Sequence, residues 1–238
     1  GNTNKKEEFF MKKVLSILLA LIIALSAFSM AAFAADAPKT KTEALLDKLY
    51  TATELQVSFT PDKKFASDLP MSAMTVYAKG NDIAVDTKLG FLPVRAVKTG
   101  NACYAYSPLL PFAYLSIDSK VIDGIIGDKD IWEYVHKTVD SARLLLAYVK
   151  SYDEKIGDET YLVEEFNDRE HVTTKFYYKD DMLKLINVYN DADKTTQVTT
   201  INDYSFTVDA AVFKAPAGID LTKLLKLFGF IKGLPLAA

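Results

Sequence analysis

The chain is poor in the residues that most often carry chemistry: it has one cysteine, two histidines and three arginines. A single cysteine, Cys103, excludes an intramolecular disulfide. Cys103 sits in the apolar run Ala102–Tyr106 and is interpreted as a small buried hydrophobe rather than a reactive thiol. Two histidines without a cysteine cluster do not make a zinc site. We therefore expect no metal site and no cofactor.

The recognisable catalytic patterns are missing as well. The sequence has no Gly-x-Ser-x-Gly elbow and no phosphate-binding loop. Glu164 and Glu165 are neighbours in a predicted strand, so they point to opposite faces and cannot work as an acid/base pair. His136 lies on a predicted helix and is interpreted as a structural residue. The sequence predicts a protein that is not an enzyme, with no catalytic residues.

The N-terminal part has the layout of a signal peptide. Met11–Lys13 is basic, Val14–Ala27 is apolar, and Ala32–Ala34 has the small-x-small pattern of a cleavage site. A retained membrane anchor is the alternative, but the short apolar core favours cleavage. We predict a signal peptide over residues 11–34 that is cleaved near Ala34.

Residues 1–10 precede the first methionine and are interpreted as translated upstream sequence. Residues 35–238 are predicted to form a single domain outside the cytoplasm of a bacterium, secreted or periplasmic. Removing residues 1–34 takes away four lysines and two glutamates, which leaves the remaining chain more acidic than the net charge of −3 of the whole. This charge argues against nucleic acid as a partner.

Two groups of short segments are predicted to be strands, because they alternate in polarity or are rich in β-branched and aromatic residues. They are Leu55–Thr60, Ala73–Lys79, Ile83–Thr87, Leu92–Val97, Ala102–Tyr106, Phe112–Ile117, Tyr161–Phe166, Val172–Tyr178, Leu183–Tyr189 and Thr196–Thr207. Most of the gaps within each group are too short for a helical crossover, so the strands form antiparallel meanders. Because proline cannot donate a ladder hydrogen bond, the strand that contains Pro93 is predicted to lie at an edge of the sheet or to contain a bulge.

Helical spacing predicts an amphipathic helix over Thr42–Tyr50 and a longer helical region over residues 119–150. Asp130 and Glu133 fit a capping box, so the main helix is expected over residues 131–150. The element order is helix, strands, long helix, strands, helix. This order predicts an α+β fold in which a large curved antiparallel sheet wraps over a long central helix.

The second meander carries a resemblance to a known family. Phe176–Leu183 is an aromatic strand that turns through two aspartates into a leucine, and Phe213–Pro216 follows Asp209 after the last strand. These features resemble the bacterial lipoprotein-carrier superfamily of LolA, LppX and RseB-like proteins. The resemblance implies an unclosed barrel with helices in its mouth that holds acyl chains or a hydrophobic partner. The family's carrier gates its cavity with an arginine, for which Arg95 is the candidate here.

The resemblance thus predicts an extracytoplasmic carrier or binder of a hydrophobic ligand, such as an acyl chain, a lipid or a lipidated protein, in a cavity between sheet and helices. The candidate lining residues are Val76, Ile83, Tyr104, Tyr106, Trp132, Val135, Val139, Leu145, Phe176 and Tyr177. The same rings could form only the core of the sheet, and a register slip of one residue would turn every side chain to the other face. The alternative function is a cell-surface interaction or sensor domain with a filled core.

The C-terminal segment departs from this family. Residues 219–234 are strongly apolar and predict a helix with Asp220 as its N-cap. Its apolar face contains Leu221, Leu224, Leu225, Phe228 and Ile231, with lysines opposite. Three partners for this face are considered: the open end of the sheet, which the helix would cover as a lid, a membrane surface, and a second subunit. The lid is favoured and peripheral membrane contact comes second; the oligomeric state is left open.

Overall fold

The computed structural model describes residues 40–61, 73–118, 130–168 and 172–227. The predicted upstream sequence and signal peptide lie outside these ranges. The described strands are β1 (Glu54–Pro61), β2 (Met74–Lys79), β3 (Asp82–Leu89), β4 (Leu92–Thr99), β5 (Ala102–Tyr106), β6 (Ala113–Ile117), β7 (Ala147–Ile156), β8 (Glu159–Asn167), β9 (Val172–Lys179), β10 (Met182–Asn190), β11 (Thr195–Ser205) and β12 (Ile219–Asp220). The helices are α2 (Lys41–Thr51), α5 (Ile131–Leu145), α6 (Thr222–Leu227) and the short 3-10 helix η1 (Ala210–Phe213).

All twelve described strands belong to one sheet, in the order β12-β6-β5-β4-β3-β2-β1-β11-β10-β9-β8-β7. Strands β1 to β6 form one meander and β7 to β11 form another, and the two meanders join where β1 pairs with β11. Neighbouring strands are antiparallel except for β12, which pairs with β6 in parallel. The predicted large antiparallel sheet is confirmed, with β7 and β12 as strands that the sequence pattern did not reveal.

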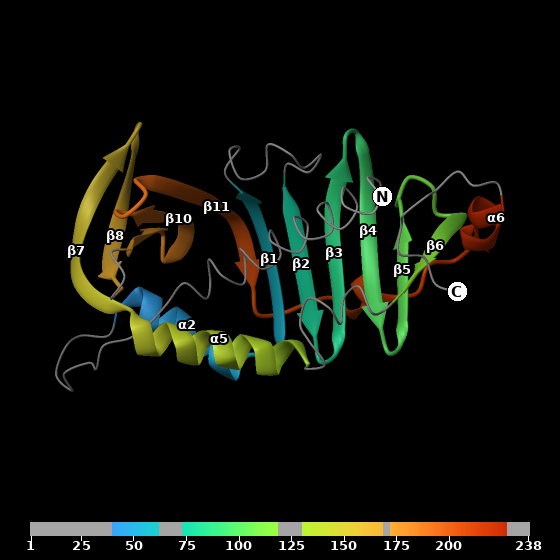
Figure 1. Ribbon diagram of the computed structural model, residues 1–238, viewed down its shortest axis with the longest axis horizontal. Helices are drawn as coiled ribbons and strands as arrows, with labels where there is room; N and C mark the ends of the chain where they lie inside the picture. The colour runs from blue at the N-terminus through green and yellow to red at the C-terminus, as the bar shows by residue number, and fades with distance from the viewer. Residues whose placement is uncertain (1–39, 62–72, 119–129, 169–171, 228–238) are drawn as a thin grey trace.

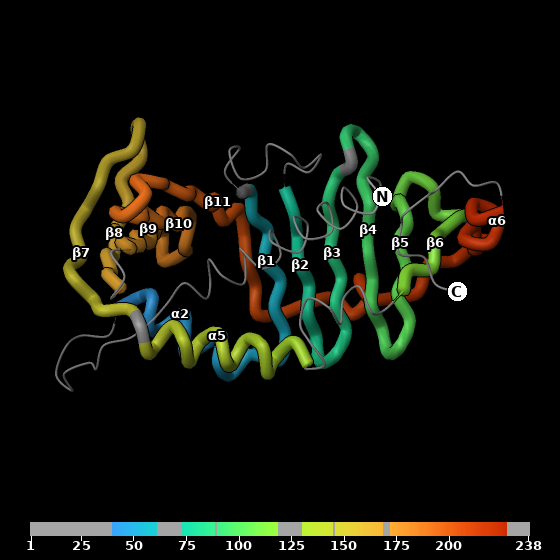
Figure 2. Tube along the Cα trace, in the orientation of Figure 1, coloured from blue at the N-terminus to red at the C-terminus, as the bar shows by residue number. Residues whose placement is uncertain are grey.

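The sheet does not close on itself. Figure 1 shows it curling strongly at the end formed by β7 to β10 and lying flatter at the end formed by β2 to β6. The tube in Figure 2 shows α2 and α5 side by side along the lower ends of the strands, from the curled end to β3. The architecture is therefore an open, curved sheet with two helices against one part of it.

Helix α2 confirms the helix predicted over Thr42–Tyr50. It begins with a capping box, in which the Thr40 hydroxyl accepts from the Glu43 amide at 3.1 Å and the Thr40 amide donates to the Glu43 carboxylate at 2.7 Å. This arrangement satisfies two groups that a helix start would otherwise leave unpaired. Leu46 and Leu49 are the buried leucines of the helix and face the sheet.

The prediction of a long central helix over residues 131–150 is wrong in the length of the helix. Asp130 caps α5 as predicted, its carboxylate accepting from the Glu133 amide at 2.7 Å, but the helix ends at Leu145. Leu146 is already extended, and the following residues pair with β8 over the whole length of β7. The turn at Gly157, with φ of 62°, closes this hairpin. The spacing of Leu146 and Val149 suits a helix, but pairing with β8 decides the structure instead.

The strand that contains Pro93 is not a complete edge strand. Strand β4 lies between β3 and β5, and Pro93 pairs with Lys88 of β3. Strand β5 reaches only as far as Arg95, however, so β4 has no partner on that side at Pro93. The missing amide therefore costs no ladder bond there.

The C-terminal segment also differs from its prediction. Ile219 and Asp220 form the short strand β12 instead of the first turn of a helix, and α6 covers only Thr222–Leu227 within the described residues. The Asp220 carboxylate accepts from the Thr222 amide at 2.9 Å, so Asp220 ends the strand just before the helix. Phe228 and Ile231 lie outside the described residues.

The two faces of the sheet are distinguished by what packs on them. On the face that we call helix-facing, α2 and α5 bury a cluster around Phe59, Phe176 and Ile186, each 1% exposed. On the opposite face, which we call outer, η1 packs Phe213 against Ala84 and Val97. Side chains alternate between these faces along each strand.

Candidate ligand-binding face

The helix pair is anchored to the curled end of the sheet by a buried carboxylate. Glu164 of β8 is buried and accepts from the amides of Lys41 and Thr42, each at 2.8 Å, and from the Thr42 hydroxyl at 2.7 Å. The first amides of a helix favour a negative charge, so Glu164 fixes the start of α2. The sequence reasoning placed Glu164 and Glu165 correctly on opposite faces but did not find this role, because its partners are more than 120 residues away.

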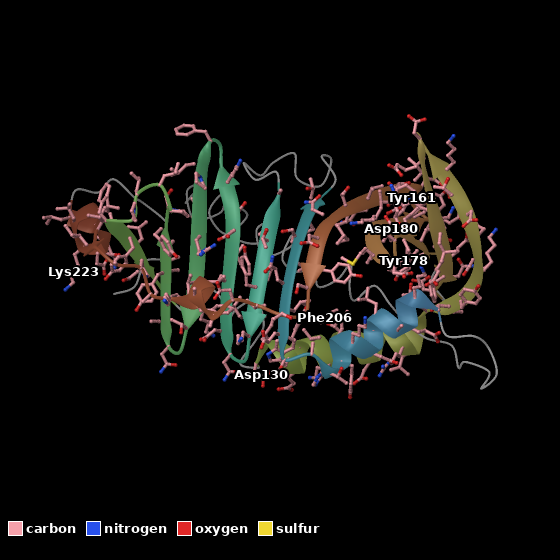
Figure 3. The ribbon with its side chains drawn as sticks, turned by 180° about the vertical axis from the view of Figure 1, so that it is seen from behind. Asp130, Tyr161, Tyr178, Asp180, Phe206 and Lys223 are labelled. Atoms are coloured by element: carbon pink, nitrogen blue, oxygen red, sulfur yellow. The ribbon has the colours of Figure 1, made fainter. Side chains whose placement is uncertain are left out.

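A tyrosine completes this network. The hydroxyls of Tyr178 and Thr42 lie 2.9 Å apart. Burial, with a smaller contribution from nearby Glu164, holds the pKa of Tyr178 well above its ordinary value. Figure 3 shows Tyr178 and Tyr161 together at the curled end of the sheet, with Lys223 at the opposite end. The polar network thus lies at the curled end and holds a neutral hydroxyl beside a buried carboxylate.

The other end of the helix pair is fixed at the hairpin between β2 and β3. The Trp132 indole donates to the Gly80 carbonyl at 2.7 Å, and Ile131 packs with Ala78 and Ile83 in a small buried cluster. Between the two helices, Arg143 pairs with Asp47 at 2.5 Å. The described helices therefore reach as far as β3 on the helix-facing side.

A continuous line of apolar side chains crosses the helix-facing side of the sheet and extends beyond β3. The pairing partners form this line one strand at a time, from β1 to β6. Its members, which we call the apolar row, are Val57, Val76, Val85, Ala96, Ala105 and Leu115. Val57 is buried under the helices, whereas the other five are half-buried. The row thus leaves the packed core and continues over strands that α2 and α5 do not cover.

The structure separates the predicted lining residues into three groups. Val76 and Ile83 lie on the helix-facing side, in the apolar row and next to it. Val139 and Phe176, each 1% exposed, lie inside the packed core, with Val135 packed against it. The Leu145 side chain is not among those described. The residues of these two groups lie on the helix-facing side of the sheet, where Val139 and Phe176 are part of the buried core.

The remaining predicted rings lie on the outer face. Tyr106 packs against the cluster of Ala84, Val97, Val208 and Phe213. Tyr104 contacts Tyr114 edge to face, with ring centroids 5.6 Å apart. Tyr177 lies on the outer side of β9, where its hydroxyl reaches Glu154 at 3.4 Å. The structure therefore does not bring these three tyrosines together with Val76 and Ile83.

Arg95, the candidate for a gating arginine, also lies on the outer face. Its guanidinium makes two hydrogen bonds of 2.6 Å with the carboxylate of Asp86, and the Tyr77 hydroxyl donates to the same carboxylate at 3.1 Å. This bidentate pairing raises the pKa of Arg95 above its ordinary value. Arg95 is thus held as half of an ion pair on the side of the sheet away from the helices.

The C-terminal helix places its apolar residues in two directions. Leu221 and Leu225 are half-buried, and Thr222 is buried. The Ser116 amide of β6 donates a hydrogen bond to the Thr222 hydroxyl at 2.7 Å. Leu224 and Leu227 are exposed, Leu227 to 80%. The helix lies beside β6, across the width of the sheet from β7 (Figure 1).

The exposed leucines of α6 have apolar neighbours at this end of the sheet. The Ile219 amide donates to the Phe112 carbonyl at 2.8 Å, which brings the loop before β6 against β12. We call the exposed residues gathered here the apolar corner; they are Leu109, Leu110, Phe112, Ile219, Leu224 and Leu227. Lys223 and Lys226 are exposed on the same short helix.

Among the residues with described positions, no group of three His, Cys, Asp or Glu side chains gathers as a metal site would require. None of the described helices has the length and apolar content needed to cross a membrane.

No family model matches the chain, and no curated protein matches it. Among solved structures, it is similar to an uncharacterized conserved protein from Thermus thermophilus at 12% identity, with a TM-score of 0.37 and coverage of 76% of this chain and 99% of the other. It is also similar to the lipoprotein LppX of Mycobacterium tuberculosis, at 9% identity, a TM-score of 0.38 and coverage of 71% and 95%. A LolA superfamily protein from Nitrosomonas europaea matches at 11% identity, a TM-score of 0.27 and coverage of 74% and 99%.

Members of the superfamily that the sequence resembles are thus among the similar structures. At these identities and TM-scores the likeness concerns the fold alone. What the chain does has to be inferred from its own side chains.

Proposed function

We propose that this chain is an extracytoplasmic, non-catalytic binder or carrier of a hydrophobic ligand, and that an acyl chain lies along the apolar row between β3 and β6. The observation that carries the proposal is the continuity of this row from the core onto strands that α2 and α5 do not cover. The predicted signal peptide supports the location, and the LolA-like resemblance supports the class of ligand.

The geometry of the row suits a narrow, flexible ligand. Neighbouring strands lie about 4.8 Å apart, so the part from Val85 to Leu115 extends over roughly 14 Å. Its two middle positions are alanines, Ala96 and Ala105, which have the smallest side chains in the row. Each methylene transferred from water to this surface would contribute about 0.8 kcal/mol. An alkyl chain is therefore the ligand that this face can bind without specific polar partners.

The test compares two substitutions in strand β5. Ala105 lies in the apolar row and Ala102 lies on the outer face, and both side chains are half-buried. We expect Ala105→Phe to fill the row and weaken the binding of a fluorescent fatty-acid probe at least tenfold, which corresponds to about 1.4 kcal/mol. Ala102→Phe is the matched control and should leave the affinity unchanged.

The alternative of an interaction or sensor domain predicts another result. If the delipidated wild-type protein shows no saturable binding of the probe, the row is not a ligand site and the filled core under the helices favours that alternative. Native mass spectrometry of the purified protein, followed by lipid extraction, would identify a ligand that survives purification.

The apolar corner supports a second role, peripheral contact with a membrane surface. Exposed apolar patches beside lysines are typical of surfaces that enter the headgroup region while the ammonium groups bind anionic lipids. Leu224 and Leu227 are exposed, which favours membrane contact over the alternative that α6 is a lid over the end of the row. As a lid, residues 219–238 would cover the end of the apolar row; as a membrane contact, they would bind the lipid surface.

Vesicle flotation separates these readings. We expect Leu224→Ser combined with Leu227→Ser to reduce the fraction bound to anionic vesicles several-fold, whereas Leu144→Ser, which changes an exposed leucine on α5, should not. Deleting residues 219–238 should likewise abolish vesicle binding. If the deletion instead raises the binding of a hydrophobic dye and lowers the melting temperature without affecting vesicle binding, α6 is a lid.

A further inference from the structure

Strand β7 forms one edge of the sheet and is the longest strand of the second meander after β11. It has ten residues, Ala147–Ile156, and among the described strands it pairs only with β8. Most of its side chains are exposed. An edge of this length presents a row of unpaired amides and carbonyls that can accept another strand.

The outer side of β7 carries a fixed pattern of charge. The pairing of Lys150 with Glu165, Tyr152 with Val163 and Glu154 with Tyr161 puts Lys150, Tyr152 and Glu154 on the outer face. The Lys150 ammonium lies 5.1 Å from the centre of the Tyr152 ring, and the Tyr177 hydroxyl contacts Glu154. A cation, an aromatic ring and an anion therefore follow one another at alternate positions along the edge.

We propose that two copies of this chain join through their β7 edges, antiparallel and centred on Tyr152, so that one sheet continues through a twofold dimer. In an antiparallel pair, residues that face each other must lie on the same face of the sheet. In a twofold antiparallel pair, one residue of β7 must therefore face the same residue of the other copy, and the twofold axis passes between the two. Because β7 is irregular between Tyr148 and Lys150, the regular part of the strand begins at Lys150.

The charges of β7 select the register. Centring the pair on Lys150, Asp153, Glu154 or Lys155 would place like charges directly opposite each other. Centring it on Ser151 would leave Lys150 opposite Tyr152. Only the register centred on Tyr152 places Lys150 of each copy opposite Glu154 of the other. The same charges that oppose pairing in other registers thus favour this one.

This pattern is the reason to assign the edge to a second copy rather than to a different partner, since β7 is complementary to itself. The edge also lies across the sheet from the apolar row and the apolar corner (Figure 1). Dimerisation through β7 would leave both of those surfaces accessible. The proposal is therefore independent of the proposed function and can fail or succeed without it.

Charge reversal tests the pairing. In sedimentation-velocity experiments over a range of concentrations, the wild-type protein should show a monomer–dimer equilibrium. Lys150→Glu alone and Glu154→Lys alone should each weaken the dimer at least tenfold, because each places like charges opposite each other. The double variant, with the two charges exchanged, should restore it. A protein that is monomeric at all concentrations, or single variants that dimerise like the wild type, would overturn the proposal.

Disulfide trapping tests the register. In the proposed pair the two Tyr152 positions face each other, and opposed Cα atoms about 4.5 to 5.5 Å apart suit a disulfide. Tyr152→Cys should form a covalent dimer on mild oxidation, whereas Lys150→Cys, the matched control, should not, because it faces Glu154. The native Cys103 is buried, so it should contribute little background. Equal cross-linking of both variants, or none, would rule out this register.

Discussion

The two ends of the sheet differ in what covers their helix-facing side. At the curled end, α2 and α5 bury Phe59, Phe176 and Ile186 almost completely. At the flat end, the apolar row continues with the same kind of side chain but stays half-buried. The same strand pattern therefore yields a buried core in one region and a half-buried apolar surface in the other.

Helix length explains this difference. With a rise of about 1.5 Å per residue, the 15 residues of α5 extend roughly 22 Å. Twelve strands spaced about 4.8 Å apart would extend roughly 53 Å if they lay flat. On a flat sheet the helix pair would therefore cover fewer than half of the strands. Curling brings the strands of the second meander around the helices, and the strands of the first meander extend beyond them.

Matched isoleucine substitutions give the largest expected contrast between the two ends. Ile186→Ala removes a side chain that is 1% exposed in the main core and should lower the free energy of unfolding by about 3 to 4 kcal/mol. Ile117→Ala removes a half-buried side chain of β6 and should cost about 1 kcal/mol. Urea denaturation of both variants measures the difference. Equal losses would mean that the flat end is as tightly packed as the curled end.

Removing the carboxylate that anchors α2 should cause the next largest loss of stability. Glu164→Ala leaves two amides and the Thr42 hydroxyl without their acceptor, which should cost about 2 to 3 kcal/mol. Hydrogen exchange should become faster in the first turn of α2. Glu165→Ala is the matched control, because this outer-face neighbour has a 3.2 Å contact from the Tyr152 hydroxyl and should cost less than about 1 kcal/mol. Unchanged exchange in Glu164→Ala would show that α2 does not depend on this carboxylate.

The sequence predicted the flat end better than the curled end, for physical reasons. Strands β2 to β5 follow one another through two-residue turns, so local alternation was enough to place them. The first four residues of strand β7, 147–150, were predicted as helix because Leu146 and Val149 also fit helical spacing. Which side of each strand faces the helices depends on long-range packing, which is why Phe176 and Tyr177 could not be told apart.

The candidate site was predictable only in its chemical character. Val76 and Ile83 were identified from strand alternation, but the row through Ala96, Ala105 and Leu115 appears only when the registers of five strand pairs are combined. Small residues such as alanine give no signal of a binding surface in sequence. The role of Glu164 was equally hidden, because a single glutamate in a strand does not reveal a partner in a distant helix.

Alkaline pH should test the polar network with a smaller effect. The folded protein holds the pKa of Tyr178 above 10.0, whereas the unfolded chain ionises near that value. Tyr178 thus contributes stability that is fully present below pH 10.0 and is lost as the pH rises further. Tyr178→Phe should cost about 1 kcal/mol at neutral pH, through the hydrogen bond to Thr42, but lose less stability on going to alkaline pH. Parallel pH profiles for variant and wild type would contradict this assignment.

Arg95 gives the smallest expected effect and separates the two faces of the flat end. Its ion pair with Asp86 is partly exposed, with side chains 22% and 31% accessible, so Arg95→Ala should lower the free energy of unfolding by only about 1 kcal/mol. Because Arg95 lies on the outer face, the affinity for the fluorescent fatty-acid probe should not change, in contrast to Ala105→Phe in the apolar row. Titration of the probe against Arg95→Ala measures this directly. A loss of probe binding in a variant that remains folded would mean that Arg95 acts on the ligand after all, and that the two faces of the flat end are coupled.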